Sequence, residues 1–458
     1  MSVTKPEINY EVSHVDQGTY SYNRVLQQSG GTTVSLTASG GNTSVFEISP
    51  AVINLAKSYF SFTLSTPDAA QATVCNAYFT QGIPCIRSIQ LSTRSGAFLV
   101  DVQNSDKYLA ASLPIETTRD EAIRADRPRL VAGVPKETFS GLCLNNGTQT
   151  TLPNVASGTD ATTPYDGLLY FLAASVSGAA GTVAINYQIP LSQWKGTLLA
   201  HPQDLFFQQS VYLTVTWNTL PKIGCLGTTI AITAGQPVAL ASAIVSKLYL
   251  NCALEQNSVA QAVARANKTI PINFLYQNAI SLPSTASTTN SVQVRYSKSQ
   301  GNKLRKLIVV PFNGSETFSG TAGILNGQYD HDNTPISALE GRIISSYFST
   351  LNGQRLEQWN PIIGNYEDFA LYREQFKESV MSRSETYYRN WCVVTDFTAG
   401  RVPWEGGYLD AGLSLDDDLI YTFNSTTSAT QLVPSILYYV WAITERLLSF
   451  RDGEITIA

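Results

Sequence analysis

The chain has 458 residues, of which 43% are hydrophobic and only 14% are charged, and its formal net charge is −5. The length allows about two to four domains, and the hydrophobic fraction excludes a disordered chain. Because the sequence has no run of Lys or Arg to neutralise a row of phosphates, we expect no direct sequence-specific binding of nucleic acid.

The N-terminal residues predict an extended arm. Residues 1–44 are polar and contain glycine, and we expect such a segment to become ordered only on assembly. Residues 1–6 contain no apolar stretch of the kind that a secretion signal requires, and no apolar run in the chain reaches 18 residues. The prediction is synthesis inside a cell and no membrane-spanning helix.

Apolar and polar residues alternate with a period of two through much of the chain. The clearest runs are 183–189, 211–218 and 419–423, and they are rich in β-branched and aromatic residues. This pattern predicts half-buried strands of antiparallel sheets. Turn-forming residues separate the runs, with 31 glycines and 20 prolines in the whole chain, which favours β-sandwiches or barrels.

Helical patterns are sparse. Segments 104–126, 254–267 and 366–383 combine apolar spacings of three or four with charged residues, and we expect helices there. Segments 145–163 and 281–290 are rich in Gly, Ser, Thr and Asn, which predicts long surface loops.

An internal repeat is the most informative feature of the sequence. One pair of similar segments, Ser88–Leu99 and Ser345–Leu356, predicts a strand–turn–strand unit in each half of the chain. Gly96 and Gly353 lie at the turns, because glycine tolerates the positive φ of a tight turn. Matches in the same order indicate duplication. The three pairs of matching blocks are Lys57–Leu64 with Lys247–Leu254, Ser88–Leu99 with Ser345–Leu356, and Leu213–Asn218 with Leu419–Asn424.

These features predict an all-β chain with a few short helices, folded as two tandem eight-stranded jelly-roll β-sandwiches. We place an N-terminal arm at 1–44, the first jelly roll at 45–240 and the second at 241–458. Each half then has about 200 residues, which is too many for a minimal immunoglobulin domain and suits a jelly roll with insertions.

Few residues are candidates for chemistry. The three histidines are His14, His201 and His331, and only His331 lies in an acidic cluster, Asp330 to Asn333. We interpret that cluster as an exposed polar loop, and Asp416 to Asp418 as a solvated turn, because a metal site needs several spaced ligands.

No motif of a hydrolase, a metalloprotease or a nucleotide-binding protein occurs in the sequence. Glu367, Asp368 and Glu405 stay open as members of a carboxylate pair for glycoside chemistry, since such pairs meet only in space. We predict a chain that is not an enzyme, with no catalytic, cofactor-binding or metal-binding residues.

The six cysteines are scattered and form no CxxC pair, so buried free thiols are expected. A bridge between Cys75 and Cys85 stays open. Most aromatic residues lie at strand positions, where core packing explains them. Trp404 lies in a predicted loop instead, and it is our candidate for a contact with another subunit or with a ligand.

The chain resembles the double jelly-roll major capsid proteins of the adenovirus, tectivirus and large DNA virus lineage, with virophages and polinton-like viruses nearest. The resemblance covers about residues 45–458. The matching segments are Val45–Pro50, Asn54–Leu64, Ile189–Ser192, Leu198–Leu199, Asp204–Phe206, Lys247–Leu250, Lys303–Leu307, Ser349–Leu356, Tyr387–Trp391 and Gly412–Leu415.

This resemblance implies a structural capsid protein of an icosahedral double-stranded DNA virus, which forms pseudo-hexameric homotrimeric capsomers. The implied partners are further copies of the chain, neighbouring capsomers, penton and minor capsid proteins, and an internal membrane that the arm faces. The implied location is the virion capsid, with synthesis and assembly inside the host cell. The low charge of the chain agrees with large subunit interfaces.

Two other classes of protein remain as alternatives. One is a carbohydrate-binding β-sandwich, such as an adhesin or a fibre protein, whose surface is also poor in charge. The other is a glycoside hydrolase with a jelly-roll fold. A stable trimer in solution favours the capsid protein, whereas a monomer that binds glycans favours the adhesin.

Overall fold

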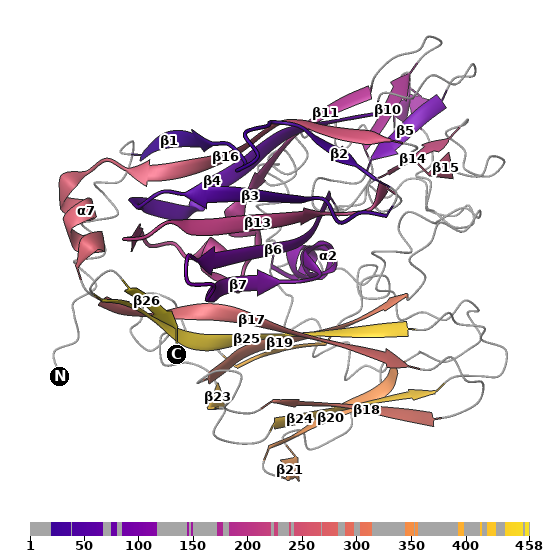
Figure 1. Ribbon diagram of the computed structural model, residues 1–458. Coiled ribbons are helices and arrows are strands. Elements are labelled where there is room, and N and C mark those ends of the chain that lie inside the picture. The colour runs from indigo at the N-terminus through magenta and orange to yellow at the C-terminus, as the bar shows by residue number, and fades with distance from the viewer. Residues whose placement is uncertain are drawn as a thin grey trace.

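The computed structural model forms two β-sandwiches that lie one against the other (Figure 1). The structure describes residues 20–37, 39–66, 75–79, 85–116, 144–145, 148–149, 172–176, 183–220, 224–227, 238–239, 242–266, 268–282, 289–296, 303–313, 344–351, 353–355, 393–397, 413–414, 419–426, 436–451 and 454–457.

The first sandwich has two main sheets, with the hydrogen-bonded orders β1-β16-β4-β11 and β3-β13-β6-β7. Its strands are β1 (Tyr20–Val25), β3 (Thr43–Ile48), β4 (Ala51–Thr66), β6 (Ile86–Thr93), β7 (Phe98–Val102), β11 (Val183–Pro190), β13 (Val211–Trp217) and β16 (Ala243–Glu255).

The second sandwich repeats this arrangement with the orders β17-β25-β19-β22 and β18-β24-β20-β21. Its strands are β17 (Lys268–Leu282), β18 (Thr289–Tyr296), β19 (Lys303–Asn313), β20 (Ile344–Leu351), β21 (Gln354–Arg355), β22 (Val393–Asp396), β24 (Leu419–Thr426) and β25 (Ile436–Arg451).

Both sandwiches follow the same winding. In each, the first of the main strands pairs with the last, and the second pairs with the last but one. This nesting of outer strands around inner ones is the jelly-roll topology. The predicted fold, two tandem eight-stranded jelly rolls, is confirmed.

Shorter strands and helices are added to the two rolls. β5, β10, β14 and β15 form a separate small sheet, and the other added strands extend the main sheets or pair with each other. These elements are β2 (Val34–Leu36), β5 (Cys75–Phe79), α2 (Ser105–Glu116), β8 (Leu144–Asn145), β9 (Thr148–Gln149), β10 (Leu172–Val176), η3 (Leu191–Gln193), η4 (Leu198–Ala200), β12 (Leu205–Phe207), β14 (Gly224–Gly227), β15 (Val238–Ala239), α7 (Ser258–Arg265), β23 (Leu413–Ser414) and β26 (Glu454–Ile457).

The predicted domain limits need correction. Residues 20–25, assigned to an arm, form β1 and pair with β16 along their whole length. Residues 243–255, assigned to the second roll, form β16, which pairs with β1, β2 and β4. The strands therefore divide at α7, because β16 is the last strand of the first roll and β17 begins the second.

Two of the three repeat blocks occupy equivalent places in the two rolls. The second block forms the β6–β7 and β20–β21 hairpins, whose turns contain Gly96 at φ 88° and Gly353 at φ 76°. The third block forms β13 and β24, each paired with the first strand of that hairpin. The first block was interpreted wrongly, because its two copies lie side by side in one sheet, with Leu250 opposite Phe60.

Two predicted helices form. Segment 104–126 contains α2, and segment 254–267 contains α7, where the Asn257 side chain caps the helix by accepting from the amides of Val259 and Ala260. The predicted helix at 366–383 lies outside the described residues.

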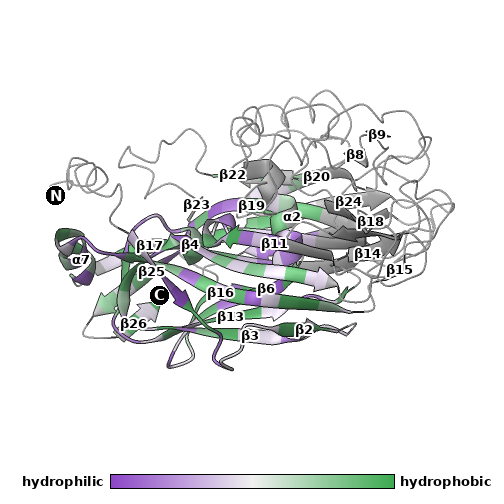
Figure 2. Cartoon of the chain, turned by 90° about the horizontal axis from the view of Figure 1, so that it is seen from above, coloured by the Kyte–Doolittle hydropathy of each residue, from purple (hydrophilic) through white to green (hydrophobic). Residues whose placement is uncertain are grey.

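The core of the first sandwich comes from the alternation seen in the sequence. Phe60, Phe62 and Leu64 of β4 point inward, and Phe62 packs between Tyr187 and Trp217. Hydrophobic residues alternate with more hydrophilic ones along β13 (Figure 2). Burial of these side chains supplies the main driving force for closing the sandwich.

Cys85 and Cys252 are buried free thiols, as predicted. The open bridge between Cys75 and Cys85 is therefore not formed. Burial raises the pKa of the Cys85 thiol from 9.0 to about 12, because the thiolate loses its hydration.

We expect the Cys85 thiol to resist iodoacetamide at about pH 8 in the folded chain and to react after unfolding, since the thiolate is the nucleophile. The Cys85 thiol has a higher pKa in the folded chain than in the unfolded chain, so it ionises first in the unfolded chain. The free energy of unfolding is therefore unaffected by this thiol below pH 9.0, and it falls as the pH rises from 9.0 towards 12. Mass spectrometry of the Cys85 peptide measures the labelling. Equal labelling rates in the folded and the urea-unfolded chain would contradict the burial.

Candidate functional site: the junction between the sandwiches

Most residues singled out in the sequence lie outside the part of the chain that the structure describes. This holds for His14, His331 with its acidic neighbours, Glu367, Asp368, Trp404, Glu405 and Asp416–Asp418. His201 is described, and its backbone N–H donates to the carbonyl oxygen of Leu198 at the end of η4.

Within the described ranges, no three His, Cys, Asp or Glu side chains gather in a way that would hold a metal ion. Nor does any helix in those ranges have the length and the apolar character needed to cross a membrane. A group of buried polar and aromatic side chains lies where the two sandwiches meet.

We call this region the junction. On its second-sandwich side are alternate residues of β25, Tyr439, Trp441, Ile443 and Glu445, with their neighbours on β17. These side chains share the outer face of their sheet because alternate residues of a strand point to the same side. On the first-sandwich side are Asn104–Tyr108, at the start of α2, and Trp194–Gly196, between η3 and η4.

Aromatic rings join the two sides of the junction. Tyr108 of α2 meets Trp441 of β25 edge to face, with ring centroids 5.6 Å apart, and Tyr439 stacks on Trp441 at 5.5 Å. Tyr108 and Trp441 are fully buried. Such aromatic pairs stabilise beyond the area that they bury, by about 0.5–1.5 kcal/mol each.

Asp106 and Lys107, two successive residues of α2, are buried at the junction, and their side chains form hydrogen bonds to different sandwiches. Lys107, 3% exposed, donates to the Tyr439 hydroxyl at 2.9 Å, and its Nζ lies 4.6 Å from the centre of that ring. Asp106, 1% exposed, accepts from Nδ2 of Asn218 in the first sandwich at 2.8 Å. The start of α2 therefore binds to both sandwiches through directional contacts, which fix orientation as well as distance.

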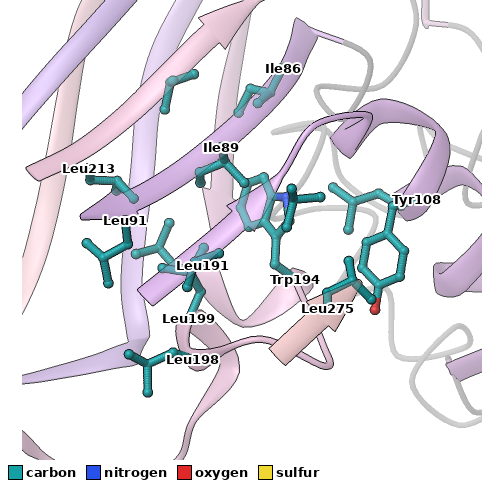
Figure 3. Close-up of a cluster of buried hydrophobic side chains, with 14 of the residues drawn as sticks. Ile86, Ile89, Leu91, Tyr108, Leu191, Trp194, Leu198, Leu199, Leu213 and Leu275 are labelled. Carbon is teal, nitrogen blue, oxygen red and sulfur yellow. The ribbon is translucent and has the colours of Figure 1, made fainter. Parts of the chain in front are cut away.

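The Trp194–Gly196 segment closes the junction from the other side. The Trp194 indole N–H donates to the Ser105 hydroxyl at 2.6 Å, and the Tyr108 hydroxyl donates to the carbonyl oxygen of Lys195. Figure 3 shows Trp194, Tyr108 and Leu275 of β17 in one buried cluster. Gly196, at φ 77°, lies so close to Ile443 that an added Cβ would be 2.6 Å from its Cδ1 atom.

A buried ion pair lies on the same outer face of the second sandwich. Arg305 and Glu445 approach to 2.5 Å, and Arg305 also donates to the Asn273 side chain at 2.8 Å. Arg305 sits where the pairing of β19 with β25 shifts register, and such a bulge redirects a side chain. The Arg305 guanidinium therefore contacts both the Glu445 carboxylate and the Asn273 side-chain oxygen, and these contacts offset part of the cost of burying the two charges.

The two sandwiches also meet near α7, the helix between them. Phe207 of β12 packs against Phe450 of β25, with centroids 6.4 Å apart, and the Arg265 guanidinium lies 5.3 Å from the Phe206 ring. Contacts at separated points prevent one sandwich from rotating on the other. The two similar halves are therefore held together at more than one place.

Sequence reasoning missed the junction residues Lys107, Trp194 and Gly196. One signal was present for two of them: the order Trp-x-Gly occurs at Trp194–Gly196 and again at Trp404–Gly406. For Lys107 the sequence holds no signal, because a single lysine in a helix is normally exposed.

Neither a protein-family model nor a curated protein matches the chain. Among solved structures, the chain is similar to the Sputnik virophage structure, with a TM-score of 0.55 and 12% identity over 96% of this chain and 88% of that chain. It is also similar to the PBCV-1 virus capsid, with a TM-score of 0.51 and 12% identity over 96% of each chain. The Faustovirus major capsid protein matches with a TM-score of 0.51 and 10% identity, over 94% of this chain and 90% of that one. The chain therefore has the double jelly-roll fold of these capsid proteins.

Proposed function

We propose that this chain is the major capsid protein of an icosahedral double-stranded DNA virus, and that three copies form a pseudo-hexameric capsomer. The observation that carries the proposal is the junction, which locks two sandwiches of identical strand order into one block. Three such blocks place six similar units in a ring. The same fold in the capsid proteins named above supports this role.

The physical advantage of the arrangement lies in its symmetry. A duplicated sandwich lets one chain fill six near-equivalent positions with three copies, and head-to-tail contacts that close into a ring limit growth. A charge content of 14% suits a surface that is largely covered by other subunits. The role is structural and involves no catalysis.

Further parts of the proposal concern the surroundings of the capsomer. We place the protein in the virion capsid, assembled inside the host cell, with neighbouring capsomers, penton proteins and minor capsid proteins as its partners. An internal membrane beneath the shell is a further partner. The proposal assigns no sequence-specific contact with nucleic acid to this chain.

Light scattering after size-exclusion chromatography tests the capsomer directly. Three chains of 49.8 kDa give a trimer of about 150 kDa, and we expect this species to persist on dilution. Negative-stain images of it should show blocks with a six-sided outline. A chain that stays monomeric at all concentrations and binds a glycan array would contradict the proposal and favour the adhesin.

A further inference from the structure

Helix α7 is apolar on two of its faces. Ala260 and Ala264 are buried against β4 and β12 of the first sandwich. Val259 and Val263 lie on another side of the helix and are 67% and 52% exposed. The larger apolar side chains therefore face away from the core of the chain, although their burial there would stabilise the fold more. Because a helix that is apolar on more than one face is normally buried, its exposed face is expected to be covered in the assembled protein.

The exposed apolar face of α7 is a continuous stripe. Val259, Ala262, Val263 and Ala266 are spaced by three and four residues, which places them on one side of the helix, and all four are exposed. We call these four residues the outer stripe. Arg265, the charged residue of the helix, lies beside the stripe, and its guanidinium is 5.3 Å from an aromatic ring of β12. Figure 1 shows α7 at one end of the molecule, beyond the strand ends of the first sandwich. This uncharged surface suits an apolar partner.

The outer stripe is complementary to itself. Along the helix its side chains alternate in size, in the order Val-Ala-Val-Ala. A second α7 that runs antiparallel, about a two-fold axis between positions 262 and 263, brings Val259 opposite Ala266 and Ala262 opposite Val263. Each large side chain then meets a small one, as knobs fit holes between packed helices. The antiparallel arrangement also places the positive end of each helix dipole beside the negative end of the other.

The symmetry of such a pair decides which copies it joins. A contact of one surface with the same surface on another copy is isologous, and it pairs two chains about a two-fold axis. A ring of three chains needs a heterologous contact instead, so the α7 pair cannot belong to the ring. It can only join chains that belong to different capsomers.

We propose that the outer stripe of α7 packs antiparallel against the outer stripe of α7 in a chain of a neighbouring capsomer. The inference rests on the proposed function, and it adds a contact that links one capsomer to the next. The eight residues of α7 make a helix of about 12 Å, which covers far less than the ~800 Å² per partner of a stable interface. One such contact is therefore weak, but every capsomer has three copies of it, and linked contacts strengthen one another in a shell.

An introduced thiol tests the pairing. Ala262→Cys places a thiol beside the two-fold axis, close enough for a disulfide between two helices. We expect mild oxidation to link position 262 to itself in assembled particles, with a yield at least about tenfold higher than in free trimers at the same chain concentration. A residue linked to itself can only join two chains, and mass spectrometry identifies the peptide. A thiol that stays unlinked in assembled particles, whether it is reactive or shielded by another segment, would overturn the inference.

Charged residues on the stripe provide a second test with a matched control. We expect Val259→Lys and Val263→Lys together to abolish particles and to spare the trimer, because the pairing would bring like charges together. The control pair Ser49→Lys and Gln203→Lys adds the same charge at exposed positions near the same strand ends, and it should assemble as the wild type does. Electron microscopy counts the particles, and circular dichroism checks the fold. Normal assembly of the Val259 and Val263 variant would contradict the pairing.

Exchanging the sizes of two side chains tests the antiparallel register. Ala262→Val alone sets two valines against each other, and Val263→Ala alone leaves two alanines in contact. We expect each single variant to raise the chain concentration at which particles form. The double variant exchanges large and small, so each valine again meets an alanine and the concentration should return towards that of the wild type. A double variant no better than either single one would show that the register is wrong.

These results separate the inference from the proposed function. A wild-type chain that forms trimers and particles without the disulfide at position 262 would remove the α7 pair and leave the capsid role intact. A wild-type chain that stays monomeric would remove the capsid role itself.

Discussion

Replacing Arg305 by Met is expected to lower the free energy of unfolding by about 3–5 kcal/mol, because it leaves the buried Glu445 carboxylate without its cation. The two side chains are 8% and 9% exposed and approach to 2.5 Å, so water cannot replace the lost partner. Urea unfolding, followed by tryptophan fluorescence, measures the change.

The double variant Arg305→Met with Glu445→Leu is the control for this prediction. Removing both charges leaves no unpaired charge, and only the partly buried Asn273 side chain loses a donor, so we expect the double variant to recover most of the lost stability. A double-mutant cycle then separates the pair from each residue's other contacts. A single variant within about 0.5 kcal/mol of wild type would show that the pair is solvated.

Replacing Gly196 by Ala is expected to lower the free energy of unfolding by about 2–5 kcal/mol and to loosen the junction. The residue has φ 77°, which disfavours any side chain by about 1–2 kcal/mol. Its new Cβ would also lie 2.6 Å from Ile443 Cδ1 and 3.1 Å from the Tyr108 hydroxyl, and overpacking of this kind costs about 1–3 kcal/mol. Thermal and urea unfolding of the variant measure the loss.

Gly96→Ala is a matched control for Gly196→Ala. Gly96 has φ 88°, but no atom lies within 4 Å of an added Cβ, so this variant pays only the backbone cost. The difference between the two variants measures the close approach of the sandwiches. Equal losses would show that the contact of Gly196 with Ile443 adds nothing, and pairing Gly196→Ala with Ile443→Ala should then bring no recovery.

The strands and turns of this protein could be predicted from its sequence. The strands β11, β13 and β24 follow predicted alternations, because the pleat of a strand places alternate side chains on one face whatever its neighbours are. The hairpin turns at Gly96 and Gly353 were predicted because few residues accept their positive φ. Duplication of the roll followed from two blocks that keep the same order.

The predictions were wrong for strands whose place in the fold depends on the strands beside them in space. β16 resembles β4 in sequence, and we took the two for equivalent strands of different rolls. The same resemblance is compatible with two neighbouring strands of one sheet, and the structure shows that arrangement. β1 has mostly exposed side chains and lacks an apolar stripe, so its sequence resembles an arm. Backbone hydrogen bonds to β16 hold β1 in the sheet. The sequence gives no sign of these bonds, because every residue other than proline carries the same backbone donor and acceptor.

The sequence by itself determined the strands, the turns and the two jelly rolls, because these depend on periodicity and on backbone conformation over a few residues. Only the tertiary structure decided the division at α7, the burial of Lys107 and the packing of the outer sheet of the second sandwich against the first. Those features depend on contacts between residues far apart in the chain, such as Lys107 with Tyr439 and Gly196 with Ile443. A local pattern carries no information about the partner that a buried face will meet.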